Sequence, residues 1–404
     1  MNLNEIMSPS ALDPMIMAGD FSPDCRFFSF LKGSSSDPSK MDLWAYDLEA
    51  KTARVLVATN QLTSNDEKLS DEEKARRERL RLFVSGISAY EWSPVNQQVL
   101  LFLAGAIFLR QADGGIVPVV ESGAMDAKFS PKGQYVSWIS ERNLHLWNVG
   151  SGVSTPLTNH GGGTISVGAA EFVAEEELQR FEGYWWSDDE AYIAFEEFDE
   201  SQVEIKKRHE IYADRVDIVE QRYPAAGKTN VSWKLGVLDI NSRETIWVPI
   251  STEDSYLARA AWNQGAFFFM ILNRLQTEAQ IFRYDLKSRV LRKILSETSL
   301  PWFNLVDKLR FTPSGELVLV SERTGFASVF IYSAEGEAKS SLCFNGESVL
   351  KIVNIHDDAI DLICATRDGM GHVAKRCSLK EQGKEQGKEQ GKEQGKEQGK
   401  EQGK

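Results

Sequence analysis

One short phrase recurs along the chain and limits the folds that are open to it. The phrase is an aromatic residue, then Ser-Pro or a close variant with a turn residue, then a run of alternating apolar residues. It occurs as Phe21-Ser-Pro-Asp, Trp92-Ser-Pro-Val, Phe129-Ser-Pro-Lys, Trp186-Ser-Asp-Asp and Phe311-Thr-Pro-Ser. Serine and proline favour tight turns, and alternation is typical of strands, so each copy predicts a turn that leads into a strand.

A second phrase follows downstream of the first and consists of a strand pattern that ends in a polar turn. Its copies are Asp42-Leu-Trp-Ala-Tyr-Asp, Asn143-Leu-His-Leu-Trp-Asn, Lys234-Leu-Gly-Val-Leu-Asp, Gln280-Ile-Phe-Arg-Tyr-Asp and Ser328-Val-Phe-Ile-Tyr-Ser. Together the two phrases make a unit of about four short strands, repeated every 40 to 50 residues or so. Such repeats predict an all-β fold, a β-propeller of about seven four-stranded blades. The units start near residues 18, 82, 125, 165, 257, 305 and 348.

Composition narrows the class of protein. The 404 residues are 42% hydrophobic, which is enough for a large core. No run approaches the roughly 18 apolar residues of a membrane span, and the first residues lack the features of a signal peptide. Four widely spaced cysteines suit reduced, mostly buried thiols. We therefore expect a cytoplasmic protein, or a periplasmic one if the N-terminus is incomplete.

The net charge argues against one class of function, and the end of the chain sets the limit of the predicted propeller. A net charge of −13 argues against nucleic-acid binding, because phosphate backbones attract basic surfaces. The chain closes with six copies of Lys-Glu-Gln-Gly and a final Lys, which have no apolar face. We expect the propeller to occupy residues 1–379 and the repeat tail, 380–404, to be disordered.

A catalytic nucleophile, a metal site and a cofactor site are not predicted. The nearest approach to a G-x-S-x-G elbow is Gly86-Ile-Ser-Ala-Tyr, in which Tyr90 replaces the second glycine. None of the five histidines has metal-ligand spacing. His160 precedes three glycines, but these lack the context of a phosphate loop and are read as a flexible turn.

Three consecutive carboxylates, Glu175, Glu176 and Glu177, precede Tyr184-Trp-Trp. At about 100 degrees per residue on a helix, two can converge while the third points elsewhere. Converging carboxylates bind an ammonium group through charge-assisted hydrogen bonds. The alternative is a solvated helix face.

An insertion at residues 69–83 has a serine cap, then acidic and then basic residues, which predicts a helix. Its arginines, among them Arg77 and Arg79, can hold a peptide carbonyl or carboxylate. A solvated surface paired with the nearby glutamates is the other interpretation.

The run Glu175-Glu-Glu-Leu-Gln-Arg-Phe-Glu-Gly-Tyr-Trp-Trp closely resembles the dipeptidyl peptidase IV family of serine peptidases, and the motifs that follow it support the match. These are Phe198-Asp-Glu-Ser-Gln-Val, Tyr212-Ala-Asp-Arg and Gln221-Arg-Tyr-Pro-Ala-Ala-Gly-Lys-Thr-Asn230. They occur in order within about 60 residues, and looser similarity covers residues 10–379.

The resemblance implies an eight-bladed propeller over an α/β-hydrolase domain and the removal of N-terminal Xaa-Pro or Xaa-Ala dipeptides. In the family the last two glutamates of the motif clamp the free amino terminus of the substrate, a role that carries over to Glu176 and Glu177. We expect Glu175 to point away. An arginine of the family contacts the substrate backbone, and Arg77 or Arg79 matches it.

The family's catalytic serine, aspartate and histidine lie in the hydrolase domain, which we expect to be absent from this chain. The first hypothesis is therefore a truncated propeller portion that holds peptide N-termini but is inactive alone. The second is a stand-alone propeller that binds peptides or proteins without catalysis. Residues 203–230 resemble the dimerisation arm of the family, which makes a homodimer one further possibility.

Overall fold

The computed structural model describes residues 16–62, 74, 77–79, 85–300, 302–344 and 346–379. Most of the predicted helix at 69–83 and all of the 380–404 tail lie outside these residues. Lys74 and residues 77–79 of the insertion have helical backbone, as predicted. No helix among the described residues is long and apolar enough to cross a membrane.

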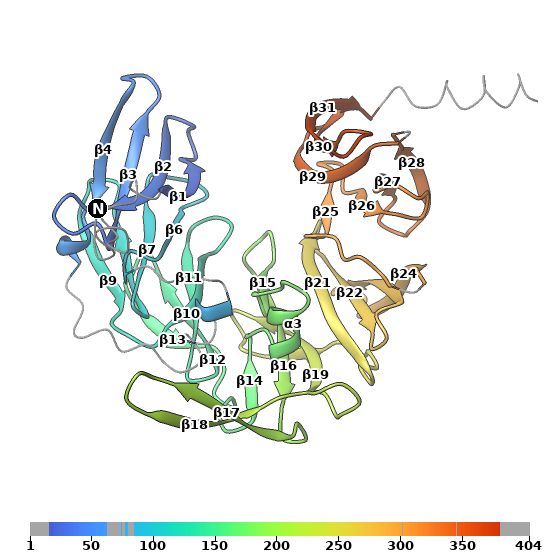
Figure 1. The fold of residues 1–404 in the computed structure, drawn as a ribbon, viewed down its shortest axis with the longest axis horizontal. Coiled ribbons are helices and arrows are strands. Elements are labelled where there is room, and N and C mark those ends of the chain that lie inside the picture. The colour runs from blue at the N-terminus through green and yellow to red at the C-terminus, as the bar shows by residue number, and fades with distance from the viewer. Residues whose placement is uncertain are drawn as a thin grey trace, which may run out of the picture. The chain divides into compact units, whose positions relative to one another are not determined.

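The chain divides into two compact units, Met1–Glu253 and Asp254–Lys404. Each is built from sheets whose strands are hydrogen-bonded largely in chain order (Figure 1). The pairings are antiparallel apart from one short parallel pairing in blade 1. In the first unit, blade 1 contains β1 (Ile16–Phe21), β2 (Phe27–Gly33), β3 (Lys40–Asp47), β4 (Thr52–Val57) and β5 (Ser85–Gly86), with a short 3-10 helix η2 (Thr59–Gln61). Blade 2 contains β6 (Ala89–Trp92), β7 (Val99–Leu103), β8 (Ala106–Arg110) and β9 (Ile116–Val120). Blade 3 contains β10 (Met125–Phe129), β11 (Tyr135–Ser140), β12 (Asn143–Asn148) and β13 (Ser154–Pro156).

Blade 4 completes the first unit and carries two additions. Its strands are β14 (Ile165–Val167), β15 (Tyr184–Trp186), β16 (Tyr192–Asp199), β19 (Ser232–Asp239) and β20 (Thr245–Trp247). The short helix α3 (Phe172–Glu176) lies between β14 and β15 in the chain. A separate two-stranded hairpin, β17 (Ile205–Ile211) and β18 (Val216–Arg222), follows β16 and is called the arm hairpin below (Figure 1).

The second unit contains three further blades. Blade 5 contains β21 (Ser255–Asn263), β22 (Ala266–Asn273), β23 (Glu278–Asp285) and β24 (Val290–Thr298). Blade 6 contains β25 (Arg310–Phe311), β26 (Leu317–Ser321), β27 (Ser328–Tyr332) and β28 (Ala338–Leu342). Blade 7 has three described strands, β29 (Ser348–Ile355), β30 (Ala359–Ala365) and β31 (His372–Ser378). These are the blade sheets of a β-propeller, and the seven found among the described residues confirm the predicted number. Six first strands begin within about five residues of the predicted starts, whereas the first strand of blade 2 begins at Ala89 and not near residue 82.

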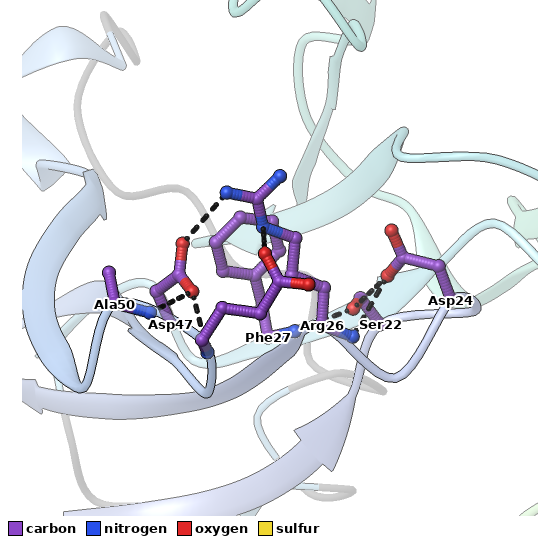
Figure 2. Close-up of polar contacts among 7 residues, drawn as sticks. Ser22, Asp24, Arg26, Phe27, Asp47 and Ala50 are labelled. Carbon is purple, nitrogen blue, oxygen red and sulfur yellow. Dashed lines mark hydrogen bonds and ion pairs between the residues drawn. The ribbon is translucent and has the colours of Figure 1, made fainter.

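The first repeated phrase forms the turn that leads into the second strand of a blade sheet, which is β2 in blade 1 and β16 in blade 4, where β15 precedes the turn. In blade 1, Ser22 Oγ accepts a hydrogen bond from the backbone N–H of Phe27 at 2.9 Å and donates one to Asp24 at 2.6 Å (Figure 2). The hydroxyl satisfies a backbone donor that the tight turn would otherwise leave open. Equivalent hydroxyls in blades 3, 4 and 6 belong to Ser130, Ser187 and Thr312.

The second phrase ends in a residue that closes the turn between the third and fourth strands. Asp47 Oδ1 accepts hydrogen bonds from the backbone N–H groups of Glu49 and Ala50, both at 3.0 Å (Figure 2). In blades 3, 4 and 5 the Oδ1 atoms of Asn148, Asp239 and Asp285 accept equivalent hydrogen bonds from backbone N–H groups of the turn. The two phrases recur because the same two turns recur in successive blades.

Neighbouring blades of each unit pack through apolar faces. One buried cluster joins Leu31 and Leu43 of blade 1 to Leu101 of blade 2, and another joins Leu100 of blade 2 to Trp138 of blade 3. A third cluster in the second unit joins blades 6 and 7. Side chains that alternate along each strand supply both faces of a sheet, so one strand contributes to two clusters.

The arm hairpin occupies the segment in which an arm was predicted. One face carries four exposed apolar side chains, Ile205, Ile211, Val216 and Ile218, and Ile211 is 80% exposed. The same face also carries polar and charged side chains, among them the ion pair of Lys207 and Glu220. Side chains at alternate positions, among them Arg208 and Glu210, lie on the opposite face.

All four cysteines are free thiols. The expectation that they are mostly buried is wrong, because Cys25 and Cys343 are exposed and only Cys364 is fully buried. Cys25 lies in the turn between β1 and β2 with a positive φ of 56°, a position at the surface of the blade.

Candidate functional site

The glutamate run lies on α3 and at its C-terminal end. Glu171 begins the helix as its N-cap: its two carboxylate oxygens accept hydrogen bonds from the backbone N–H groups of Val173 and Ala174, at 2.7 and 2.8 Å. The helix ends at Glu177, whose N–H donates to Val173 O at 2.9 Å. Val173, Ala174 and Glu175 are buried, whereas Glu176 and Glu177 are exposed.

Glu175 does not point away, and that expectation is wrong. Its side chain is 7% exposed and forms a short ion pair with Arg79 Nη1. Glu176, with a side chain 43% exposed, accepts a hydrogen bond from Arg79 Nε at 3.1 Å. Glu175 and Glu176 therefore converge on one guanidinium. Glu175 is the one that needs it, because a buried carboxylate requires a cation nearby.

Glu177 has a different environment from its two neighbours. Its side chain is exposed and has no hydrogen-bond or ion-pair partner among the described residues. The site thus presents one carboxylate that is already oriented by an arginine, Glu176, and one that is open to a ligand, Glu177.

The two candidate arginines lie in different surroundings. Arg79 lies over the Phe172 ring at 4.8 Å in addition to its contacts with Glu175 and Glu176. Arg77 Nη2 donates a hydrogen bond to Ser88 Oγ at 3.0 Å. The structure therefore brings Arg79 to the glutamates and places Arg77 against the segment that precedes β6.

The adjacent aromatics serve mainly to join blades. Tyr184 is fully buried and its hydroxyl donates to Asp126 O at 2.6 Å, while Trp186 Nε1 donates to Ser137 Oγ at 2.8 Å. Both acceptors belong to blade 3. Phe172, and not these aromatics, supplies the ring that Arg79 lies over.

Sequence reasoning missed a buried charged network below α3. Arg180 Nη2 forms an ion pair of 2.7 Å with Glu196 Oε2, and both side chains are buried. Burial raises the pKa of Glu196, against the opposing effect of Arg180. Burial, followed by the charge of Glu196, raises the pKa of Glu171 to about 7.

A sequence signal for this network exists. The strand Tyr192–Asp199 is almost entirely buried and yet contains Glu196 and Glu197. A carboxylate in such a strand requires a cation from elsewhere in the fold. Arg180 supplies it for Glu196, and Lys234 does so for Glu197 at 2.9 Å. The His160 ring nitrogen Nε2 also forms a hydrogen bond of 2.6 Å with Glu197 Oε2. His160 therefore has a defined contact next to the three glycines.

The histidine, cysteine and carboxylate side chains of the described residues do not gather into a metal-binding group. No group of three or more His, Cys, Asp or Glu residues suited to a metal ion occurs among the described residues. The histidine rings there that form hydrogen bonds contact Ser140 O, Glu197, Asn354, Asp361 and Arg376. None of these bonds joins a serine hydroxyl to an imidazole.

Comparisons with known proteins agree on one relationship. Residues 108–363 match the family model "Dipeptidyl peptidase IV (DPP IV) N-terminal region", which is more than half of the chain. The chain is 27% identical over 252 residues to "Probable dipeptidyl peptidase 4" of Aspergillus fumigatus, covering 57% of this chain and 32% of that protein. It is 26% identical over 333 residues to dipeptidyl peptidase 8 of Homo sapiens, covering 65% of this chain and 37% of that protein.

A solved structure extends the likeness of fold over almost all of the chain. The crystal structure of Porphyromonas gingivalis dipeptidyl peptidase 4 matches with a TM-score of 0.73 and 21% identity. The match covers 94% of this chain and 55% of that one. The chain thus spans about a third of the length of these curated relatives and about half of the solved structure.

Proposed function

Because this chain belongs to the dipeptidyl peptidase IV family through its N-terminal region, we propose that it is the substrate-gating propeller of a serine exopeptidase. The proposed reaction of the whole enzyme is the release of N-terminal Xaa-Pro or Xaa-Ala dipeptides. The observation that carries the proposal is the pair of exposed carboxylates, Glu176 and Glu177, at the end of α3.

Glu176 and Glu177 would bind the free amino terminus of a peptide. An ammonium group donates three hydrogen bonds, and charge-assisted bonds to carboxylates are stronger than neutral ones. Arg79 holds Glu176 in one direction before any ligand arrives, which reduces the entropy lost on binding. The α-ammonium group occurs only on the first residue of a peptide, so its binding by the pair would place the bond after the second residue for cleavage.

Arg79 is the better of the two candidates for contact with the peptide backbone. Its Nη1 and Nε atoms bind Glu175 and Glu176, and its Nη2 has no partner among the described residues. That remaining donor can reach a peptide carbonyl beside the bound amino terminus. Arg77, which donates to Ser88, is the second candidate.

Catalysis in this proposal belongs to an α/β-hydrolase part with its own serine, aspartate and histidine. The described residues contain meander sheets and no such part. The 404-residue chain alone should therefore bind peptides without cutting them. Incubation with Ala-Pro-p-nitroanilide tests this: we expect no nitroaniline, and its release by the purified chain would refute the proposal.

Substitution of the two glutamates tests the binding role. We expect Glu177→Gln and Glu176→Gln each to weaken the binding of an Ala-Pro peptide about tenfold or more, because each removes a charge-assisted bond. Isothermal titration calorimetry measures the affinity. Glu141→Gln, which alters an exposed carboxylate in the turn between β11 and β12, is the matched control and should bind like the parent. Equal affinity in all four proteins would exclude the pair.

We also propose that a second copy of the chain docks on the arm hairpin. The support is the four exposed apolar side chains that share one face of the hairpin with charged ones, Ile205, Ile211, Val216 and Ile218. Exposed apolar groups bordered by polar residues are typical of interaction sites.

A further inference from the structure

The segment that carries Glu176 and Glu177 depends on contacts from outside itself. Helix α3 has five residues. Helices this short are not stable alone in water, because the first turn costs more conformational entropy than its hydrogen bonds return. The position of the two carboxylates must therefore be set by the residues that anchor the segment.

Arg180 connects three parts of blade 4. Its backbone N–H donates to Ala174 O of α3 at 2.9 Å. Its Nη1 donates to Glu182 O, just before β15, at 2.5 Å, and its Nη2 binds Glu196 of β16 at 2.7 Å. The planar guanidinium fixes the directions of its two bonds, to the connection and to the strand, while the backbone of the same residue is bonded to the helix. The place of Arg180 thus links the positions of all three.

Glu196 provides the fixed end of this arrangement. It lies on β16, which is hydrogen-bonded to β14 and β15 on one side and to β19 on the other. Its backbone N–H donates to Gly183 O and its carbonyl accepts from Gly168 N, both at 2.8 Å. The side chain is 0% exposed, and its Oε1 has no hydrogen-bond partner among the described residues. Arg180 is therefore the group that compensates the buried carboxylate.

The third buried charge lies at the other end of the helix. Glu171, 3% exposed, binds the first backbone N–H groups of α3. It is influenced by both members of the ion pair, since the charge of Glu196 repels its carboxylate and that of Arg180 attracts it. Removal of Arg180 would thus leave two carboxylates buried together, one at each attachment of the segment.

We infer that Arg180 and Glu196 are positioning residues, which hold residues 171–183 against β16 and so place Glu176 and Glu177 for a ligand ammonium. The placement follows from the contacts of the ion pair, and its effect on a ligand rests on the proposed function. Neither residue touches the ligand in this scheme.

A buried ion pair fixes the positions of its two residues more than it raises the net stability of the fold. The cost of removing two charges from water offsets much of their attraction, and apolar pairs of similar volume often replace such pairs without loss of stability. The double variant Arg180→Met with Glu196→Leu therefore separates the two roles, because it leaves no charge of the pair behind and fills the same space.

Hydrogen exchange measured by mass spectrometry on the full chain is the direct test. In the double variant we expect the amides of residues 173–183 to exchange at least tenfold faster. Those of β19, and of β16 apart from residue 196, whose N–H donates to Gly183 O, should keep the parent rate. The control removes the partly exposed pair of Arg142 and Glu200, 2.9 Å apart, through Arg142→Met with Glu200→Leu. It should leave exchange at 173–183 unchanged.

Unchanged exchange at 173–183 in the double variant would overturn the inference. An equal acceleration in β16 and β19 would do the same, since it would reveal a purely structural role. Calorimetry with an Ala-Pro peptide adds the functional readout, in which we expect the double variant to bind at least tenfold more weakly than the parent. If the parent itself binds no peptide, the proposed function fails, while the exchange data still decide the positioning role.

Discussion

Glu171 couples the stability of the chain to pH. The residue is 3% exposed, caps α3 and lies within the electrostatic influence of Glu196 and Arg180. Burial is the main reason that its pKa is raised to about 7, and the negative charge of Glu196 adds to it. The backbone N–H groups of Val173 and Ala174 and the charge of Arg180 act in the opposite direction. The perturbation that we choose is Glu171→Gln, which keeps an acceptor for the helix but cannot titrate.

The sign follows from the direction of the shift. The folded protein holds the Glu171 proton more tightly than the unfolded chain, in which the pKa is near 4.5. The stability from this proton is therefore complete below about pH 4.5 and is lost as the pH rises through about 7. At about 1.4 kcal/mol per pKa unit, the whole loss amounts to roughly 3 kcal/mol.

Urea denaturation of the parent and of Glu171→Gln at pH 5 and pH 8 measures this loss. The parent should be stabilised relative to the variant by about 2.5 kcal/mol more at pH 5 than at pH 8. Glu141→Gln, with an exposed carboxylate, is the control and should show no comparable change. A difference between parent and Glu171→Gln that is equal at both pH values, or larger at pH 8, would refute the reasoning.

Three further predictions concern the core, a blade turn and the arm. Phe269 is 0% exposed, and Phe269→Ala should lower the free energy of unfolding by about 3 to 5 kcal/mol. Leu275 is 77% exposed, and Leu275→Ala should change it by less than about 0.5 kcal/mol. Urea denaturation measures both changes. Ser187→Ala removes the hydroxyl that accepts from the Tyr192 N–H at 2.9 Å and should cost about 1 kcal/mol in the same assay, so an unchanged midpoint would contradict its role in the turn. Ile211→Glu with Ile218→Lys should abolish the concentration-dependent dimer that we expect by sedimentation velocity, and a parent that stays monomeric at all concentrations would exclude the arm as a dimer contact.

The number of blades and most of their starts could be predicted because the turns are local. A hydroxyl such as that of Ser22 and a carboxylate such as that of Asp47 close turns within a few residues of themselves. The residues that close each turn therefore lie within a short stretch of sequence, and the same residue types recur wherever the turn recurs. The length of the chain between copies then gives the size of a blade.

The site could be predicted only in part, because its contacts join residues far apart in the chain. Arg79 reaches Glu175 across 96 positions, so the sequence could not tell which of three adjacent glutamates turns inward. Helical spacing predicted that two of them converge, but the target of the convergence is an arginine from another segment. The ion pair of Arg180 and Glu196 joins the connection after α3 to a strand, and spacing alone does not reveal it.

The most direct test of the account compares two peptides that differ only at the amino terminus. Calorimetric titration of the chain with an Ala-Pro peptide should give measurable binding, and the same peptide with an acetylated amino terminus should bind roughly 10- to 100-fold more weakly. The acetyl group removes the positive charge that Glu176 and Glu177 are proposed to hold, and charge-assisted bonds are worth about 1.5 to 3 kcal/mol. Equal affinity for the two peptides would contradict the account.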